Sequence, residues 1–444
     1  MQEDGASLRS EIDKRPLSRF QGMLVAAGFV FLVMDGYDVQ IVGYIAPVLT
    51  QLWHLQPGAF GSIFGAGLIG LTIGTLICGP IADRIGCRPV LIGCTILYGV
   101  ATLVTTQVTS FDALLVMRFI TGLGLGGAMP VTIAVVSDYS PTRVRLQMVA
   151  ITTAGFAIGS LVGALVAALT VDRFGWTSVF FIGGVMPLFL LPLLVYWFPE
   201  SLPRLLSDAR FQNELGRIVE KLAPGCTPSK STVLGSVEKK FPVFVLFDKG
   251  QMPHTLLIWA IAFCNLLLLY FFVNWIPTVV HGAGLPLRAA NETAAIFQIF
   301  GIVGGLVVNY YSDRSGKSHL LMGLAFIGAA VCCVLFDRVD LKSFTSILVC
   351  AAASGFFVMG GLGGIIAYSG THYSPEVRAT GVSWALGIGR FGSILGPIFG
   401  GLLLSAQTGT DLLFTFFAAP ATLAAICAFF LGAARPVRTS KLSI

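Results

Sequence analysis

The sequence predicts an all-α membrane protein in which twelve transmembrane helices form two pseudo-symmetric six-helix bundles. The long apolar stretches, the composition and an internal repeat all indicate this class. A hydrocarbon core about 30 Å thick requires about 20 apolar residues of helix to cross it. Twelve stretches of the 444-residue chain are long enough. We expect these helices at residues 20–49, 58–82, 89–106, 111–137, 146–170, 177–198, 254–280, 290–311, 318–336, 344–368, 379–405 and 411–434.

The composition is that of a membrane protein rather than a soluble one. Hydrophobic residues make up 55% of the chain and charged residues 11%, whereas a soluble domain has about 25% charged residues. Residues 1–19 are polar and charged, and the apolar run that follows is too long for the core of a cleavable signal peptide. This run is therefore predicted to be the first membrane-spanning helix.

The positive charges indicate the orientation in the membrane. Most of the 28 Lys and Arg residues fall on the side of the predicted helices that holds the N-terminus. The opposite side holds only Arg173, Arg288, Arg338 and Lys342. Because loops rich in Lys and Arg stay in the cytoplasm, we expect both termini to be cytoplasmic and the protein to lie in the inner membrane. The net charge of +6 then reflects topology, and no nucleic-acid partner is expected.

One long hydrophilic stretch divides the predicted helices six and six. We therefore expect an N-terminal bundle over residues 1–198, a cytoplasmic linker loop over 199–253 and a C-terminal bundle over 254–444. The charge and the prolines of the central stretch are typical of a linker, with room for one amphipathic piece.

The two halves also share short motifs. Asp83-Arg84 follows the second helix as Asp313-Arg314 follows the eighth. Tyr-Ser-Pro follows the fourth helix at residues 139–141 and the tenth at residues 373–375, at nearly the same spacing. Two such pairs indicate a duplicated six-helix unit. A parallel repeat with a binding site near the membrane midplane is the plan of a secondary transporter.

Two carboxylates in the first predicted helix, Asp35 and Asp38, are the strongest functional signal. An ionised Asp at the bilayer centre costs at least about 2.5 kcal/mol, and residues three apart share one helix face. By the rise of a helix, Arg118 and Asp38 lie at roughly 10 and 16 Å below the outer surface. We expect an Asp38–Arg118 pair that tunes proton release, with Asp35 as a second proton site. A static structural pair is the alternative.

Several motifs resemble those of the major facilitator superfamily. The loop Gly79–Arg88 resembles its hallmark loop, and Arg118–Gly124 resembles its fourth-helix motif. Pro199-Glu200-Ser201 resembles a further motif of the superfamily. Other segments resemble the aromatic acid:proton symporters within it. These segments are Asp35–Asp38, Asn274–Pro277, Arg378–Gly381, Gly389–Gly392 and Gly396-Pro397.

The resemblance implies the major facilitator fold and a function. By it, the chain is expected to import an aromatic carboxylate, such as hydroxybenzoate or protocatechuate, together with protons by alternating access. Three positions depart from the pattern. Cys87 replaces a basic residue of the hallmark loop, Asn309 replaces glycine in its second copy, and Asp138 stands where Glu is expected.

Substrate-binding candidates lie in the second half. Arg390 falls near the midplane, with Gly387, Gly389 and Gly392 leaving room beside it. A guanidinium fork binds a carboxylate through two hydrogen bonds. An aromatic ring also needs an apolar slot with a few amides or hydroxyls. The candidates for that slot are Asn265, Tyr270, Asn274, Trp275 and Gln298, and packing is the alternative role for each.

Charged residues at the cytoplasmic helix ends are predicted to gate the transporter. Asp83, Arg84 and Arg88 can form ion pairs in one conformation and release them in the other, which makes a two-state latch. Equivalent cytoplasmic positions give the remaining gating candidates. They are Asp138, Arg145, Asp313, Arg314, Glu376 and Arg378.

Other classes of function lack a signal. The nine cysteines and five histidines show no metal-ligand spacing, so no metal or cofactor is expected. No clustered nucleophile and base supports a membrane enzyme, and the central loop is too small for the signalling domain of a receptor. A transporter of another solute, such as a sugar, a dicarboxylate or an exported drug, is the main alternative. The expected partners are a small aromatic carboxylate, protons and the lipid bilayer, with the protein as a monomer.

Overall fold

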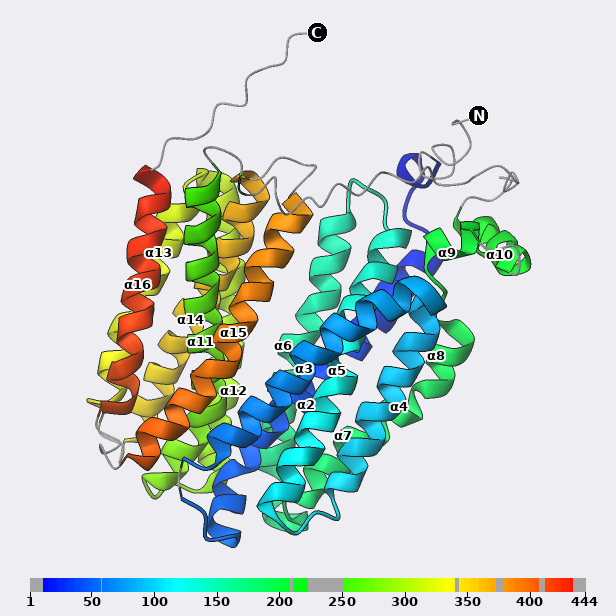
Figure 1. Ribbon diagram of the computed structural model, residues 1–444. Helices are drawn as coiled ribbons and strands as arrows, with labels where there is room; N and C mark the ends of the chain where they lie inside the picture. The colour runs from blue at the N-terminus through cyan, green and yellow to red at the C-terminus, as the bar shows by residue number, and fades with distance from the viewer. Residues whose placement is uncertain are drawn as a thin grey trace. The chain divides into compact units, whose positions relative to one another are not determined.

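The computed structural model describes residues 11–56, 58–207, 211–222, 247, 251–339, 343–372, 378–406 and 412–433. All secondary-structure elements assigned in these ranges are helices. Twelve of the helical spans are long and apolar enough to cross a membrane. The predicted all-α class is therefore confirmed. Figure 1 shows the helices. Their bounds are α2 Arg19–Leu52, α3 Phe60–Ile85, α4 Cys87–Thr105, α5 Phe111–Tyr139, α6 Arg145–Phe174, α7 Thr177–Phe189, α8 Leu191–Trp197, α9 Leu202–Ser207, α10 Gln212–Leu222, α11 Met252–Gly282, α12 Leu287–Ser315, α13 Ser318–Phe336, α14 Phe344–His372, α15 Arg378–Ser405 and α16 Leu413–Ala433.

The sixth predicted helix is interrupted. It is formed by α7 and α8, which meet at Leu190. Pro187 lies inside α7, and α8 carries a proline in its first turn, where the missing N–H needs no partner. The two prolines together account for the break. The whole span from Thr177 to Trp197 remains long enough to cross a bilayer.

Contacts within the chain define two compact units. Unit 1 contains residues 1–41, 66–166 and 173–238, and unit 2 contains residues 42–65, 167–172 and 239–444. This division passes through α2, α3 and α6 instead of following the linker. The predicted domain boundaries at residues 198 and 254 therefore stay a prediction.

Glycines bring two helices of unit 1 into backbone contact. A Cβ atom at Gly159 of α6 would lie 1.9 Å from the carbonyl oxygen of Val33 in α2. A Cβ atom at Gly36 would lie 2.0 Å from the carbonyl oxygen of Phe156 in α6. Only glycine permits this approach, which is the usual way that membrane helices pack closely. Since Gly36 stands between Asp35 and Asp38, the contact also fixes the position of both carboxylates.

Part of the stretch predicted to be a linker forms the helix α10, which belongs to unit 1. This helix is amphipathic, and its apolar side chains join a core cluster that also contains side chains of α2, α4 and α5. The side chains concerned are Leu215, Ile218, Val219 and Leu222.

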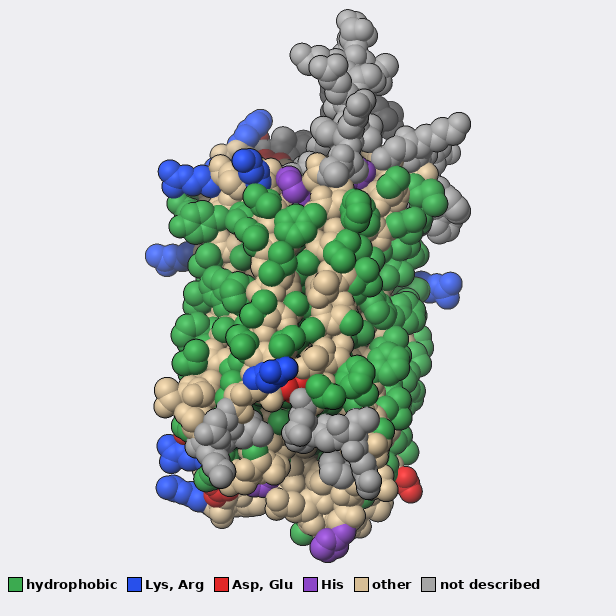
Figure 2. Space-filling model, turned by 90° about the vertical axis from the view of Figure 1, so that its left-hand side faces the viewer, with side chains coloured by type: hydrophobic (Ala, Val, Ile, Leu, Met, Phe, Trp, Pro, Cys, Tyr) green, Lys and Arg blue, Asp and Glu red, His purple; other side chains and the backbone are tan. Residues whose placement is uncertain are grey.

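The helices of unit 2 present an apolar outer surface. Figure 2 shows hydrophobic side chains over most of the face that α13 and α16 help to form. Leu324 and Val331 of α13 and Phe430 of α16 are more than half exposed. Such a large exposed apolar surface is stable only against lipid or a partner. The chain is accordingly a multi-pass membrane protein.

Replacing Gly159 with alanine tests the close contact between α2 and α6. The new methyl group would overlap the backbone of Val33, and overpacking of this kind costs about 1–3 kcal/mol. Gly93→Ala is the matched control, because no atom lies within 4 Å of a Cβ at this position of α4. We expect thermal unfolding of the purified protein at a lower temperature for Gly159→Ala than for Gly93→Ala. Equal unfolding temperatures would contradict the backbone contact between these helices.

Candidate functional site

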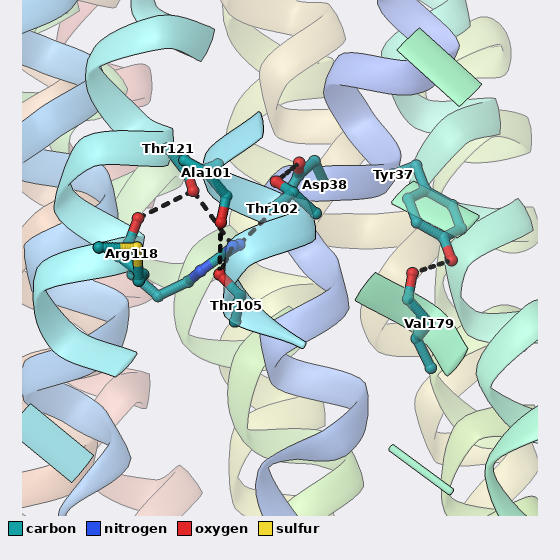
Figure 3. Close-up of polar contacts among 9 residues, drawn as sticks. Tyr37, Asp38, Ala101, Thr102, Thr105, Arg118, Thr121 and Val179 are labelled. Carbon is teal, nitrogen blue, oxygen red and sulfur yellow. Dashed lines mark hydrogen bonds and ion pairs between the residues drawn. The ribbon is translucent and has the colours of Figure 1, made fainter. Parts of the chain in front are cut away.

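A buried ion pair lies inside unit 1, between α2 and α5. Nη1 of Arg118 donates to Oδ1 of Asp38 across 3.0 Å, as Figure 3 shows. Asp38 is 1% exposed and Arg118 4%. The structure thus brings together the two residues that the sequence placed within reach of an extended arginine side chain. Their role in proton coupling stays a prediction.

Hydroxyl groups hold the guanidinium of Arg118 in place. Its Nη2 donates to Oγ1 of Thr105 across 3.2 Å and to Oγ1 of Thr121 across 3.1 Å. Each of these hydroxyls donates its own hydrogen to a backbone carbonyl one turn earlier, and so offers a lone pair to the arginine. The ring of Phe180 in α7 lies 4.9 Å from Cζ of Arg118. These contacts offset part of the cost of burying the charge.

The second carboxylate oxygen of Asp38 accepts a hydrogen bond from the hydroxyl of Thr102 in α4. The neighbouring Tyr37 points away from this pair, and its hydroxyl donates to the carbonyl oxygen of Val179 in α7 across 2.9 Å. Side chains of α2, α4 and α5 therefore meet at Asp38, and the hydrogen bond of Tyr37 connects α2 to α7. The sequence analysis missed Thr102, Thr105 and Thr121. Hydroxyl residues one turn apart in an apolar helix are the signal that could have found the first two.

Asp35 lies one turn before Asp38 on α2 and is 2% exposed. It lies within electrostatic range of Tyr98 and Cys94 of α4. This part of α2 therefore holds two buried carboxylates one turn apart, of which Asp38 is paired with the guanidinium of Arg118. An arrangement of this kind can bind a proton without creating an unbalanced positive charge.

The hallmark loop is organised by Glu200, a residue whose structural role the sequence analysis did not recognise. Its carboxylate accepts hydrogen bonds from the backbone N–H groups of Cys87, at 2.6 Å, and Arg88, at 3.3 Å. It therefore neutralises the N-terminus of α4. The hydroxyl of Tyr139 donates to the backbone oxygen of Glu200 across 2.6 Å. Arg204 donates to the backbone oxygen of Arg84 across 2.6 Å.

The predicted gating residues are placed as follows. Asp83 and Arg84 are exposed, and Arg88 pairs with Glu214 of α10 at 3.5 Å. Asp138 and Arg145 are half-buried, and Arg314 donates to Tyr310 across 2.9 Å. Arg378 and Asp313 lie in helices whose side chains at these positions are not described, and Glu376 lies outside the described residues. Their gating roles stay predictions.

The candidates for substrate binding in unit 2 fall into two groups. Two of them use their donors to hold neighbouring helices. Nε1 of Trp275 donates to the carbonyl oxygen of Pro397 across 3.0 Å, and Nδ2 of Asn265 donates to that of Val358 across 2.7 Å. Both side chains are fully buried, so the packing alternative is favoured for Trp275 and Asn265.

Among the other candidates, Asn274, Tyr270 and Arg390 keep polar atoms available within the described part of the chain. Nδ2 of Asn274 donates to the backbone of Tyr270 across 2.7 Å, and the hydroxyl of Tyr270 has no partner among the described residues. Gln298 is 4% exposed, and its side chain already interacts with neighbouring groups of the protein. Arg390 is half-buried, and its guanidinium forms no ion pair or hydrogen bond within the described part of the chain. Within that part, no group of three metal-ligating side chains is found either.

Comparison with known proteins identifies the family. The sequence model of the Major Facilitator Superfamily matches residues 28–336 and 289–443. The chain belongs to this superfamily. Over 96% of its length it is 36% identical to the gallate transporter of Pseudomonas putida, of which it covers 94%. It is 33% identical to the 4-hydroxybenzoate transporter PcaK of the same organism, with 94% of each chain covered.

A third relative is the benzoate transport protein of Acinetobacter baylyi, which is 30% identical, with 97% of this chain and 94% of the relative covered. The predicted superfamily, and within it the family of aromatic acid transporters, is thus confirmed. Since family and relatives are transporters, the chain is a transporter and not an enzyme. A solved D-xylose-proton symporter has a TM-score of 0.71 at 16% identity, with 93% of this chain and 98% of that one covered. This match confirms the fold.

The energy of the buried ion pair can be measured with a double-mutant cycle. Arg118→Gln leaves a buried carboxylate without its counter-ion, which costs about 3–5 kcal/mol. The double variant Asp38→Asn/Arg118→Gln removes both charges, so we expect it to unfold at a higher temperature than Arg118→Gln alone. Arg288→Gln is the control, because its pair with Glu292 is exposed and worth under about 1 kcal/mol. Additive effects of the two single changes would show that Asp38 and Arg118 do not interact.

Proposed function

We propose that the chain is a proton-coupled secondary transporter that imports a small aromatic carboxylate of the hydroxybenzoate or protocatechuate class by alternating access. The observation that carries the proposal is a contrast between two arginines. Arg118 has a buried carboxylate partner, whereas the half-buried Arg390 has none among the described residues. One arginine is therefore suited to control a proton site, and the other is suited to bind an anion.

The charge of Arg390 lies in an apolar span and favours an anionic ligand. A cation in an apolar span is stabilised by a partner of opposite charge, and a substrate carboxylate supplies one. The guanidinium can donate two parallel hydrogen bonds to that group. The relatives are named for gallate, 4-hydroxybenzoate and benzoate, which all carry a carboxylate on an aromatic ring. We propose Tyr270 and Asn274 as partners of the ring and its hydroxyls, and Gln298 as a further contact.

The proton argument rests on the ion pair. When Asp38 is ionised, it neutralises Arg118 at 3.0 Å. When Asp38 takes up a proton, the electrostatic attraction is lost, so the pair has two states of different geometry and charge. Binding of a proton from outside and its release inside then drives the change between two conformations. Asp35, one turn away, is the proposed second carboxylate of this site.

The position in the membrane belongs to the same proposal. The distribution of Lys and Arg favours an inner-membrane protein with both termini in the cytoplasm. The hallmark-loop charges Asp83, Arg84 and Arg88 would then face the cytoplasm, where we propose that they gate access together with Asp138, Arg145, Asp313, Arg314, Glu376 and Arg378. The proposed transporter works as a monomer.

Asp38→Asn tests the proton coupling. Asparagine mimics the protonated carboxyl group but cannot release a proton, so the variant should exchange substrate across the membrane without accumulating it. We expect uptake of labelled 4-hydroxybenzoate into proteoliposomes against a gradient to be abolished, while counterflow exchange continues. The control is Asp112→Asn, which changes an exposed Asp at the start of α5. Accumulation by Asp38→Asn that a protonophore still collapses would refute the coupling role.

Arg390→Lys tests the carboxylate site. An ammonium group keeps the charge but cannot reproduce the two-pronged hydrogen bonding of a guanidinium, and the loss of one hydrogen bond to a charged group costs about 1.5–3 kcal/mol. We expect the affinity for 4-hydroxybenzoate to fall more than about tenfold, as measured by calorimetry on the purified protein. Arg338→Lys, at an exposed position, should leave the affinity unchanged. If 4-hydroxybenzamide stabilises wild type as well as the acid does, the proposed carboxylate site is wrong.

A further inference from the structure

The threonines of α4 use their hydroxyl groups in two different ways. Thr95 and Thr105 each donate to the backbone carbonyl oxygen one turn earlier, Leu91 and Ala101, both across 2.8 Å. This is the usual behaviour of a buried threonine in a helix. Thr102 lies on the same helix and is also fully buried, but its hydroxyl donates to Oδ2 of Asp38. Figure 3 shows the contrast between Thr102 and Thr105.

A hydroxyl group carries one hydrogen and two lone pairs, so it can either donate to a carboxylate or accept from a carboxylic acid. Oδ1 of Asp38 already accepts from Arg118, which leaves Oδ2 as the atom that takes up a proton. With Oδ2 protonated, Thr102 can accept that proton's hydrogen bond. Its own hydrogen then turns to the carbonyl oxygen of Tyr98, the acceptor equivalent to those used by Thr95 and Thr105.

We propose that Thr102 is a positioning residue that follows the protonation state of Asp38 and sets the pH at which Asp38 releases its proton. The inference rests on the proposed proton coupling. Thr102 donates to the ionised form and accepts from the protonated form, so Oδ2 of Asp38 keeps a hydrogen-bond partner in both states. A valine of the same shape would satisfy neither state.

The other groups around Asp38 cannot replace this hydroxyl. Arg118 of α5 contacts Oδ1, and Phe180 of α7 contributes only its ring to Arg118. Tyr37 of α2 uses its hydroxyl on Val179. Asp35 of α2 is a carboxylate and, when ionised, has no hydrogen to donate. Tyr98, one turn before Thr102 on α4, is within electrostatic range of Asp38, but it has no hydrogen bond to Asp38 among the described contacts.

The sign of the effect follows from the charge. The hydrogen bond that Thr102 donates to the ionised carboxylate is charge-assisted and about twice as strong as the neutral bond that it accepts from the protonated form, so its net effect favours the ionised form. Removing the hydroxyl therefore lets Asp38 keep its proton up to a higher pH. At internal pH values where the wild-type protein already releases its proton, the variant still holds it. Proton release then limits the rate of net uptake by the variant. The difference between a hydrogen bond to a charged group and one to a neutral group is large enough to move such a midpoint by about one pH unit.

The test measures transport by Thr102→Val in proteoliposomes as a function of internal pH, at fixed external pH. We expect the midpoint of net 4-hydroxybenzoate uptake to move upward by about one pH unit or more. Equilibrium exchange, which needs no net proton release, should stay within about twofold of wild type. Thr102→Ser should restore the wild-type midpoint. Thr95→Val, which removes a hydroxyl bonded to the backbone of the same helix, should leave it unchanged.

Each other outcome overturns the inference. An unchanged midpoint in Thr102→Val, an equal shift in Thr95→Val, or a failure of Thr102→Ser to restore the midpoint would show that the hydroxyl has no such role. If Thr102→Val does not insert into the membrane, Thr102→Cys and Thr102→Ala replace it with the same expected direction. Asp38→Asn separates the two proposals. If Asp38→Asn still accumulates substrate with protons, the proposed coupling is wrong. If Asp38→Asn loses coupling but the pH midpoint of Thr102→Val is unchanged, only the role of Thr102 is refuted.

Discussion

The absence of water from the hydrocarbon core is the constraint on which the structure depends. A charged group that leaves water must find all its partners within the protein. The Asp38–Arg118 pair meets most of this demand with Thr102 on the carboxylate and with Thr105, Thr121 and the Phe180 ring on the guanidinium. Nε of Arg118 is buried without a hydrogen-bond partner among the described residues. Because these groups come from α2, α4, α5 and α7, the ion pair requires the helices of unit 1 to be held in a defined arrangement.

Glycine supplies that arrangement. The backbone contacts of Gly36 and Gly159 bring α2 against α6, and similar contacts through Gly122 and Gly126 bring α5 against α3. Helices in lipid gain no hydrophobic energy by associating with one another. Close packing and hydrogen bonds must therefore provide the precision that the polar site needs. The glycines let the helices approach closely enough for the buried charged groups to reach their partners.

The sequence was sufficient to predict the helices and the main ion pair. Apolar runs report helix length directly, and the rise per residue placed Asp38 and Arg118 at depths that an extended arginine side chain can bridge. It was not sufficient to predict Thr102 or Glu200 as partners. Thr102 is 64 residues from Asp38, and Glu200 is 113 residues from Cys87. Contacts over such separations depend on which faces of the helices meet, and a strongly apolar helix has no polar face to reveal that.

The duplicated sequence suggests how the two halves came to differ. Counted back from the two Asp-Arg motifs, Asn265 corresponds to Asp35 and Leu268 to Asp38; counted back from the two Tyr-Ser-Pro motifs, Ala352 corresponds to Arg118. The second half thus keeps an amide where the first has a carboxylate, and apolar side chains where the first has its ion pair. Arg390 forms no ion pair within the described part of the second half. Under the proposed function, the proton site would therefore lie in one half and the anion site in the other. A transporter that must bind both a proton and an organic anion needs this separation, because a carboxylate beside Arg390 would compete with the substrate.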